Sequence, residues 1–240
     1  MMSPPRQLTF RWPHSPSFAR EDFLAAPSNL EALAAVDQWP NWASRMLMLV
    51  GPEGAGKSHL GAIWARAAGA VFLAGEELDE PSLEACAKAS AVLIEDADQA
   101  MGAEAILFHL INAALQYNAW LLLTSRTGPD NWGLDTPDLL SRLRLAPVVR
   151  LAAPDIELTE AVLFKLFSDR QLQVEPHVIA YIALRIERSL GAARELVAML
   201  DNEALTQGRR ITRAMASAAL RQMSSDQMSS DQMSSDNEWP

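Results

Sequence analysis

A glycine-rich segment at residues 51–58 constrains the fold of this chain more than any other feature. Glycines at its spacing let backbone N–H groups point inward and cradle phosphate oxygens. The lysine of such a loop is placed for the β- and γ-phosphates, and the serine hydroxyl for Mg²⁺. The segment therefore predicts a phosphate-binding loop for a nucleotide. It matches the pattern G-x-x-x-x-G-K-[ST] at every position and consists of Gly51, Pro52, Glu53, Gly54, Ala55, Gly56, Lys57 and Ser58.

The residues on both sides of this loop fit the same interpretation. The run 46–50 is continuously apolar, as in a buried parallel strand. Residues 57–68 place apolar side chains on one helical face, and a helix that starts at Lys57 would add its positive end to the loop. We include His59, in the first turn of that helix, among the cofactor-binding residues. The alternative is an ordinary strand–turn–helix whose glycines occur by chance.

Strands and helices alternate over the first two thirds of the chain, which predicts an α/β core with a five-stranded parallel sheet. After residue 154 the pattern indicates helices alone. Besides 46–50, the expected strands are 71–73, 91–94, 120–123 and 148–151. The expected helices are 57–68, 82–89 with Ser82 as the cap, 103–118, 137–144, 157–170, 176–188, 191–206 and 212–222.

The expected organisation has four parts. Residues 1–16 form an extended arm, 17–153 the α/β core, 154–222 a small all-α lid and 223–240 a tail. The last part contains most of a segment that repeats Gln-Met-Ser-Ser-Asp three times. Such a low-complexity segment is expected to be disordered.

Charge and composition limit the partners and the compartment. The net charge is −10, and an acidic chain is a poor candidate for wrapping nucleic acid by itself. A single cysteine, Cys86, excludes an internal disulfide, which suits a reducing compartment. No apolar run is long enough to span a bilayer, and the N-terminus does not resemble a secretory signal. We therefore expect a cytoplasmic protein without membrane contact.

Polar residues end two of the predicted strands. Glu95 and Asp96 follow the run 91–94, at the strand end where ligands bind in α/β sheets. Glu95 is expected to help hold Mg²⁺, and Asp96 to orient or activate the attacking water. Thr124 and Ser125 end the next strand and are candidates to sense the γ-phosphate. The alternatives are a solvated strand end for the acids and hydroxyls that only cap the strand.

The order of these motifs resembles the AAA+ family and, within it, the ATPase module of the bacterial initiator DnaA. The resemblance extends over residues 18–220. It implies that Arg142 is an arginine finger that acts on a neighbouring subunit, and that Arg194 reaches back to the nucleotide of its own subunit. Without the resemblance, Arg142 would be a surface charge and Arg194 would pair with Glu195 or Glu203. The segments that carry it are 91–96, 121–125, 137–143 and 191–196.

Two departures separate this chain from the initiators, and the family that it resembles instead is the Hda family of DnaA-like regulators. The initiators usually have Asp where this chain has Glu95, and they continue into a helix-turn-helix domain where this chain has the repeats. Members of the Hda family start with a short clamp-binding peptide, to which Gln7-Leu8-Thr9-Phe10 is similar. Leu8 and Phe10 would be apolar anchors and Gln7 would supply hydrogen bonds. The alternative is that the arm packs onto the core.

The resemblance implies a negative regulator of DNA replication initiation. It would bind ADP or ATP between core and lid, attach to the DNA polymerase sliding clamp, and promote hydrolysis of the ATP bound to DnaA. It would touch DNA only through the clamp. A weak ATPase activity of its own is compatible with Lys57, Glu95 and Asp96, and a homodimer or higher oligomer stays open. The rivals are a helicase loader and a nucleotide-gated adaptor that leaves its partner's ATP untouched.

Overall fold

The computed structural model of this chain describes residues 18–100 and 102–235, with the backbone alone over 227–235. Its core is one parallel sheet of five strands in the order β2-β3-β4-β1-β5. The predicted α/β class and five-stranded parallel sheet are thereby confirmed. The strands are β1 (Met46–Val50), β2 (Val71–Ala74), β3 (Ala91–Glu95), β4 (Trp120–Ser125) and β5 (Val148–Arg150).

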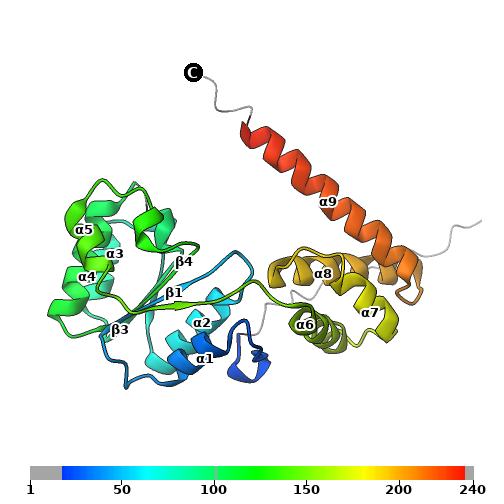
Figure 1. Ribbon diagram of the computed structural model, residues 1–240, viewed down its shortest axis with the longest axis horizontal. Coiled ribbons are helices and arrows are strands. Elements are labelled where there is room, and N and C mark those ends of the chain that lie inside the picture. Colours follow the sequence, from blue (N-terminus) through cyan, green and yellow to red (C-terminus); the bar gives the residue numbers. More distant parts are fainter. Residues whose placement is uncertain (1–17, 101, 236–240) are drawn as a thin grey trace, which may run out of the picture.

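Helices cover both faces of the sheet (Figure 1), which explains why its central strands are apolar without alternation. Side chains of β1 alternate between two apolar clusters: Met46, Met48 and Val50 face α4, while Leu47 and Leu49 face α2. Helices α1 (Leu30–Asp37) and α2 (Lys57–Ala68) cover one face, and α3 (Glu80–Ala87), α4 (Glu104–Gln116) and α5 (Pro137–Leu143) cover the other.

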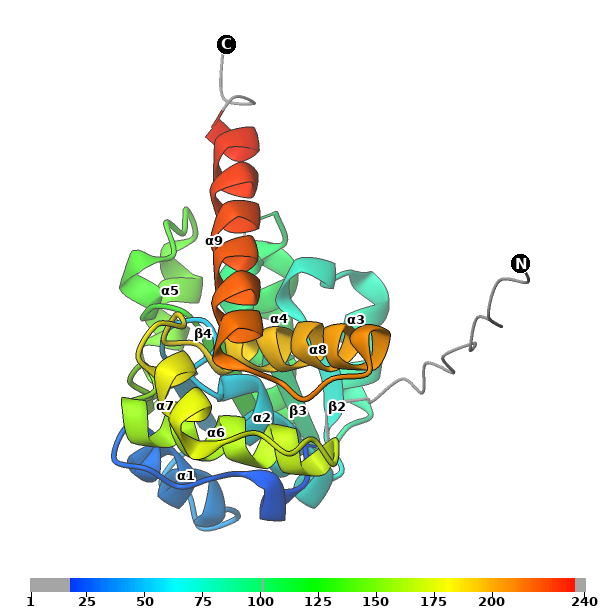
Figure 2. The same cartoon turned by 90° about the vertical axis from the view of Figure 1, so that its right-hand side faces the viewer.

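The lid consists of helices around a third apolar cluster, separate from those of the sheet. It follows β5 directly and lies beside the end of the sheet at which β1 leads into α2 (Figures 1 and 2). No strand occurs in its described residues, as predicted. Its helices are α6 (Ile156–Asp169), α7 (Pro176–Ala183), α8 (Leu190–Gln207) and α9 (Arg213–Ser235).

The start of α3 differs from the expectation that Ser82 caps it. Asp79 is the N-cap: its carboxylate accepts from the Ser82 backbone N–H at 3.0 Å, and its own N–H donates to Ser82 Oγ at 3.3 Å. The two residues form a capping box that satisfies two otherwise unpaired N–H groups. The helix therefore begins at Glu80, two residues before the predicted position.

The end of the chain also differs from the expected disordered tail. Helix α9 continues through residue 235 and projects away from the lid (Figures 1 and 2). No glycine or proline interrupts residues 209–239, and Met and Gln are good helix formers. Over the described part of the chain, no helix has the length and apolarity needed to cross a membrane.

Candidate functional site

The loop between β1 and α2 folds around the buried side chain of Lys57. The Lys57 Nζ atom donates to the carbonyl oxygens of Gly51 at 2.8 Å and Pro52 at 3.0 Å. Burial lowers the pKa of Lys57, while the nearby carboxylates of Asp96 and Asp98 act in the opposite direction. The loop thus holds a cation on neutral acceptors, where a phosphate would be a stronger partner.

Two glycines of this loop have left-handed backbone conformations that other residues rarely adopt. Gly54 has φ 69° and Gly56 has φ 103°. Gly54 also touches the lid, because its carbonyl accepts from the Leu190 N–H at 2.9 Å. A Cβ atom on Gly54 would lie 2.0 Å from Ser189 Oγ. The loop and the start of α8 are therefore in direct contact.

A cavity of about 720 Å³ lies between this loop and the lid. Arg194 of α8 lines it together with Lys57, so two cationic side chains from different parts of the fold face one space. Burial lowers the pKa of Arg194. The sequence analysis left open that Arg194 pairs with Glu195 or Glu203. In the described part of the chain it forms no salt bridge with either residue. The other core residues that line the cavity are Glu53, Gly54, Gly56, Ser58 and His59.

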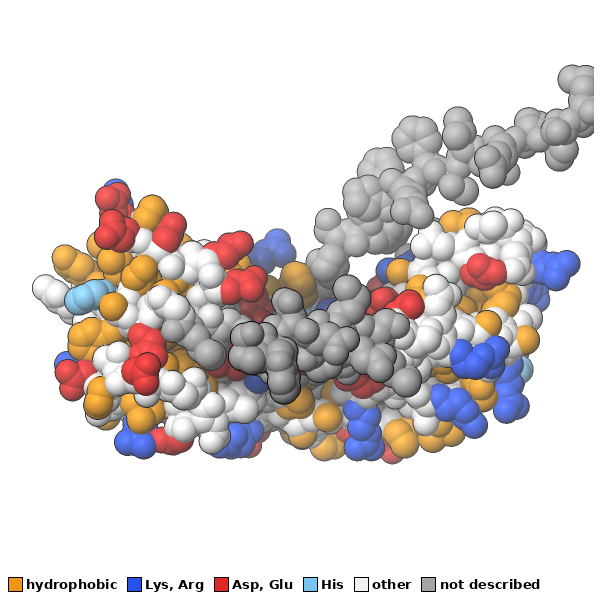
Figure 3. Space-filling view, turned by 90° about the horizontal axis from the view of Figure 1, so that it is seen from above, with side chains coloured by type: hydrophobic (Ala, Val, Ile, Leu, Met, Phe, Trp, Pro, Cys, Tyr) orange, Lys and Arg blue, Asp and Glu red, His pale blue; other side chains and the backbone are white. Residues whose placement is uncertain are grey.

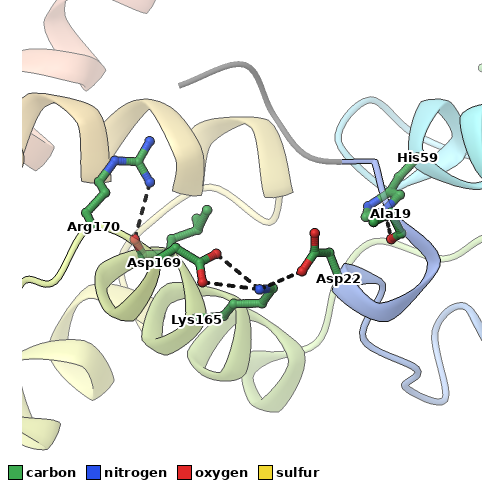
Figure 4. A network of polar contacts seen from close by, with 7 residues as sticks. Ala19, Asp22, His59, Lys165, Asp169 and Arg170 are labelled. Atoms are coloured by element: carbon green, nitrogen blue, oxygen red, sulfur yellow. Dashed lines mark hydrogen bonds and ion pairs between the residues drawn. The ribbon is translucent and has the colours of Figure 1, made fainter. Parts of the chain in front are cut away.

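A second cavity, of about 560 Å³, adjoins the first and shares Gly56, His59 and Arg194 with it. It is more apolar, with Phe23 and Leu24 before α1 and Leu158, Val162 and Leu166 on α6. Lys165 of α6 lies between Asp22 and Asp169 at its edge (Figure 4), with Nζ–Oδ distances of 2.8 Å and 3.1 Å. The two cavities together offer a polar half, in which Lys57 and Arg194 lie among the carboxylates of Glu53, Glu187 and Glu195, and an apolar half.

His59 joins α2 to the segment that precedes α1. Its Nε2 atom lies 3.1 Å from the Ala19 carbonyl oxygen (Figure 4), and its ring makes edge contacts with Phe18 and Phe23. Burial lowers the pKa of His59, the hydrogen bond to Ala19 opposes this, and Arg194 adds to the lowering. The environment therefore favours the neutral form of His59, which lies in the wall of both cavities.

Glu95 is the last residue of β3 and Asp96 follows it; the Asp96 carboxylate is near enough to Lys57 to act on its pKa. Glu95 shares the strand alternation of Ala91 and Leu93, which pack against the α2 side of the sheet. Asp96 has φ 45°, and its N–H donates to Thr124 Oγ1 at 2.9 Å. The sequence had predicted both acids at this strand end.

Asp98 is a further acid that the sequence interpretation missed. One carboxylate oxygen accepts from the Arg126 N–H at 2.9 Å, and the other is buried without a hydrogen-bond partner in the described part of the chain. The Arg126 side chain in turn pairs with Glu53 of the phosphate loop at 3.2 Å. The third acid in Glu95-Asp96-Ala97-Asp98 was the available signal for Asp98, whereas nothing local marked Arg126.

Thr124 and Ser125 are fully buried and use their hydroxyls inside the protein. Thr124 Oγ1 accepts from Asp96, as described, and Ser125 Oγ donates to the Thr127 carbonyl oxygen at 2.8 Å. These contacts favour the alternative in which the hydroxyls organise the strand ends. Thr124 thereby fixes the backbone of Asp96.

Comparisons with known proteins identify the architecture. No protein-family model matches the chain. Domain III of the replication initiation protein DnaA from Thermotoga maritima superposes with a TM-score of 0.77 and 18% identity, over 88% of this chain and 98% of that one. The chain therefore has the fold of this DnaA domain. DnaA bound to AMPPCP and single-stranded DNA gives 0.68 at 14% identity, over 81% and 69% of the two chains. A RuvB variant from Thermotoga maritima gives 0.65 at 17%, over 82% and 69%.

Other residues predicted to be functional lie apart from the two cavities. Arg142 is exposed on α5 and has no ion pair among the described residues. Its neighbour Arg144 pairs with Asp130 instead. The clamp-binding candidates Gln7, Leu8 and Phe10 lie outside the described residues.

The described residues contain no cluster of three or more His, Cys, Asp or Glu that could hold a metal ion. Mg²⁺ usually keeps several waters and binds through one or two carboxylates and phosphate oxygens. Ser58 and Glu95 remain the predicted protein ligands.

Proposed function

We propose that this chain binds an adenine nucleotide between its AAA+ core and its lid. The observation that carries the proposal is the convergence of Lys57 and Arg194 on one cavity. Two cations suit the charge of a di- or triphosphate, and the adjoining apolar cavity suits a base and ribose. Two of the DnaA structures with a similar fold are complexes with AMPPCP, which supports the choice of adenine nucleotide.

In this proposal the residues of the site have distinct roles. The loop N–H groups, Lys57 and the start of α2 would bind the phosphates, and Arg194 would close the lid over them. Ser58 and Glu95 would hold Mg²⁺, which supplies neutralising charge when bound. Asp96, with its backbone fixed by Thr124, would orient a water for slow hydrolysis.

The finer function that fits this site is negative regulation of replication initiation. In this proposal the arm attaches the chain to the sliding clamp through Gln7, Leu8 and Phe10, and Arg142 enters the nucleotide site of a DnaA molecule. The exposure of Arg142 and its lack of an ion pair in the described part support this role. A planar guanidinium suits the developing charge of a transferring phosphoryl group better than lysine does.

The test is single-turnover hydrolysis of ATP by DnaA, with clamp loaded on DNA. Wild type should stimulate hydrolysis and Arg142→Ala should not, since an arginine finger contributes roughly 10³–10⁵ in rate. Arg144→Ala is the matched control, because it removes an exposed arginine two residues away and should keep the stimulation. Deletion of residues 1–13 should abolish the clamp dependence.

Equal stimulation by wild type and Arg142→Ala would reject the finger role. If the wild type binds the clamp but does not stimulate ATP hydrolysis by DnaA, the nucleotide-gated adaptor is supported instead. Sequence-specific, nanomolar DNA binding without clamp would favour the helicase loader.

A further inference from the structure

A third cavity lies on the lid, on the side of α6 and α7 where α8 turns into α9. We call it the lid pocket; its volume is about 530 Å³. Its walls include Phe167, Val178 and Ile211, which belong to the apolar cluster of the lid. Phe164 stands at its edge with 64% of its surface exposed. The nucleotide site and the mechanism proposed above leave this pocket unused.

The rim of the lid pocket is cationic. Arg210 and Arg213 line it, with His177 and a single acid, Glu175. Neither arginine has a salt bridge within the described residues. Between residues 204 and 225 the chain contains four arginines and no acid. Figure 3 shows basic side chains gathered over the lid end, whereas acidic ones are frequent over the other end.

An apolar pocket with an arginine rim suits an acidic segment that carries one bulky apolar side chain. An aromatic side chain would bury its apolar surface in the pocket. Carboxylates beside it would form ion pairs with the guanidinium groups of the arginines. This chain contains such a segment beyond the described residues. Trp239 follows Asp236 and Glu238, and nothing else in the tail combines an aromatic residue with acids.

We propose that the lid pocket binds the segment 236–239 of a second copy of this chain. Trp239 occupies the pocket, and Asp236 and Glu238 pair with Arg210 and Arg213. Each copy carries one pocket and one segment, so two copies can exchange segments reciprocally. The result is a closed pair with two equivalent contacts.

The length of α9 excludes the same copy as the source of the segment. The helix begins at Arg213, on the rim of the pocket, and extends for 23 residues. At 1.5 Å per residue it ends about 34 Å away, and it points away from the lid (Figures 1 and 2). The four residues from Ser235 to Trp239 reach at most about 14 Å, so they fall short of their own pocket.

Sedimentation velocity on the full chain over a range of concentrations tests the proposal. Wild type should form a dimer. Trp239→Ala and Arg210→Glu should each weaken the dimer at least tenfold. Arg66→Glu, which reverses an exposed arginine on α2, is the matched control and should leave the dimer intact.

A mixing experiment distinguishes exchange from other modes of pairing. Trp239→Ala keeps an intact pocket and Arg210→Glu keeps an intact segment, so an equimolar mixture should form mixed dimers with one restored contact. Such dimers should be more stable than those of either variant alone. Circular dichroism confirms that each variant is folded.

Two results would overturn the proposal. One is a wild type that stays monomeric at every concentration. The other is a Trp239→Ala variant that dimerises with wild-type affinity, which places the interface elsewhere. Trp239 lies outside the described fold, so its replacement remains informative even if Arg210→Glu proves unstable.

Discussion

The ammonium of Lys165 lies 2.8 Å from the carboxylate of Asp22, and this ion pair joins the segment before α1 to the first helix of the lid. The two side chains are 30% and 23% exposed, so water screens the pair less than it screens a fully exposed one. The pair borders the apolar cavity. It therefore links the position of the lid to the shape of the proposed base site.

Breaking this pair should weaken nucleotide binding by a factor of about 1.4 to 5, since such ion pairs contribute about 0.2–1 kcal/mol. Titration calorimetry on Asp22→Asn, Lys165→Gln and the double variant measures the coupling between the two residues. Asp169→Asn is the control, because it removes only the partner of Lys165 within α6. Strictly additive effects of the two single variants would show that the pair does not act on the site.

Gly54→Ala should disrupt the contact between phosphate loop and lid. Its Cβ atom would meet Ser189 Oγ, so we expect at least a tenfold loss of nucleotide affinity. Gly69→Ala is the matched control: Gly69 also has a positive φ, of 61°, but a Cβ atom there would have no other atom within 4 Å. Both variants should lose about 1 kcal/mol of stability from backbone strain. If calorimetry gives Gly54→Ala and Gly69→Ala the same nucleotide affinity, the contact between loop and lid has no role in binding.

Thr124→Val should lower the unfolding free energy by about 1 kcal/mol, because it leaves the partly buried Asp96 N–H without its acceptor. Denaturant unfolding measures this loss, and Ser125→Ala serves as the comparison. If Thr124 only positions Asp96, hydrolysis should slow while ADP and ATP affinities change in parallel. A selective loss of ATP affinity would instead indicate direct contact with the γ-phosphate.

His59 should make stability depend on pH. Burial lowers the pKa of His59 from its ordinary value of 6.5, so the unfolded chain takes up a proton at a pH where the folded chain does not. The contribution of His59 to the unfolding free energy is fully present above pH 6.5. It is lost as the pH falls through the lowered pKa of His59. His59→Asn should therefore flatten the fall in unfolding free energy between pH 7.5 and 5. His109→Gln, at an exposed site on α4, should leave that fall unchanged; equal pH profiles for wild type and His59→Asn would contradict the assignment.

The elements that local sequence determines were predictable. The strand Met46–Val50 and the helix Lys57–Ala68 match their predicted bounds, because continuous apolarity and a glycine loop mark them without ambiguity. Helix α1 was missed because it is short and depends on distant contacts. Leu33 and Val36, for instance, pack in one apolar cluster with Leu60 of α2 and with Leu151, which follows β5.

The site was predictable only in part, for the same reason. The phosphate loop is contiguous in sequence, so its residues could be named in advance. Asp98 and Arg126 come from the ends of different strands and meet only once β3 and β4 pair. Arg194 reaches the cavity only because the lid docks on Gly54. Its role could be expected only from the resemblance to DnaA.

Titration calorimetry with ADP and ATP tests the central claim, nucleotide binding at the phosphate loop, most directly. Wild type should bind both, and Lys57→Ala should bind about 10- to 150-fold more weakly, since a charge-assisted contact to phosphate contributes about 1.5–3 kcal/mol. Lys88→Ala, which removes an exposed lysine at the end of α3, should bind like wild type. A folded Lys57→Ala variant with wild-type affinity, or a wild type that binds neither nucleotide, would contradict the account.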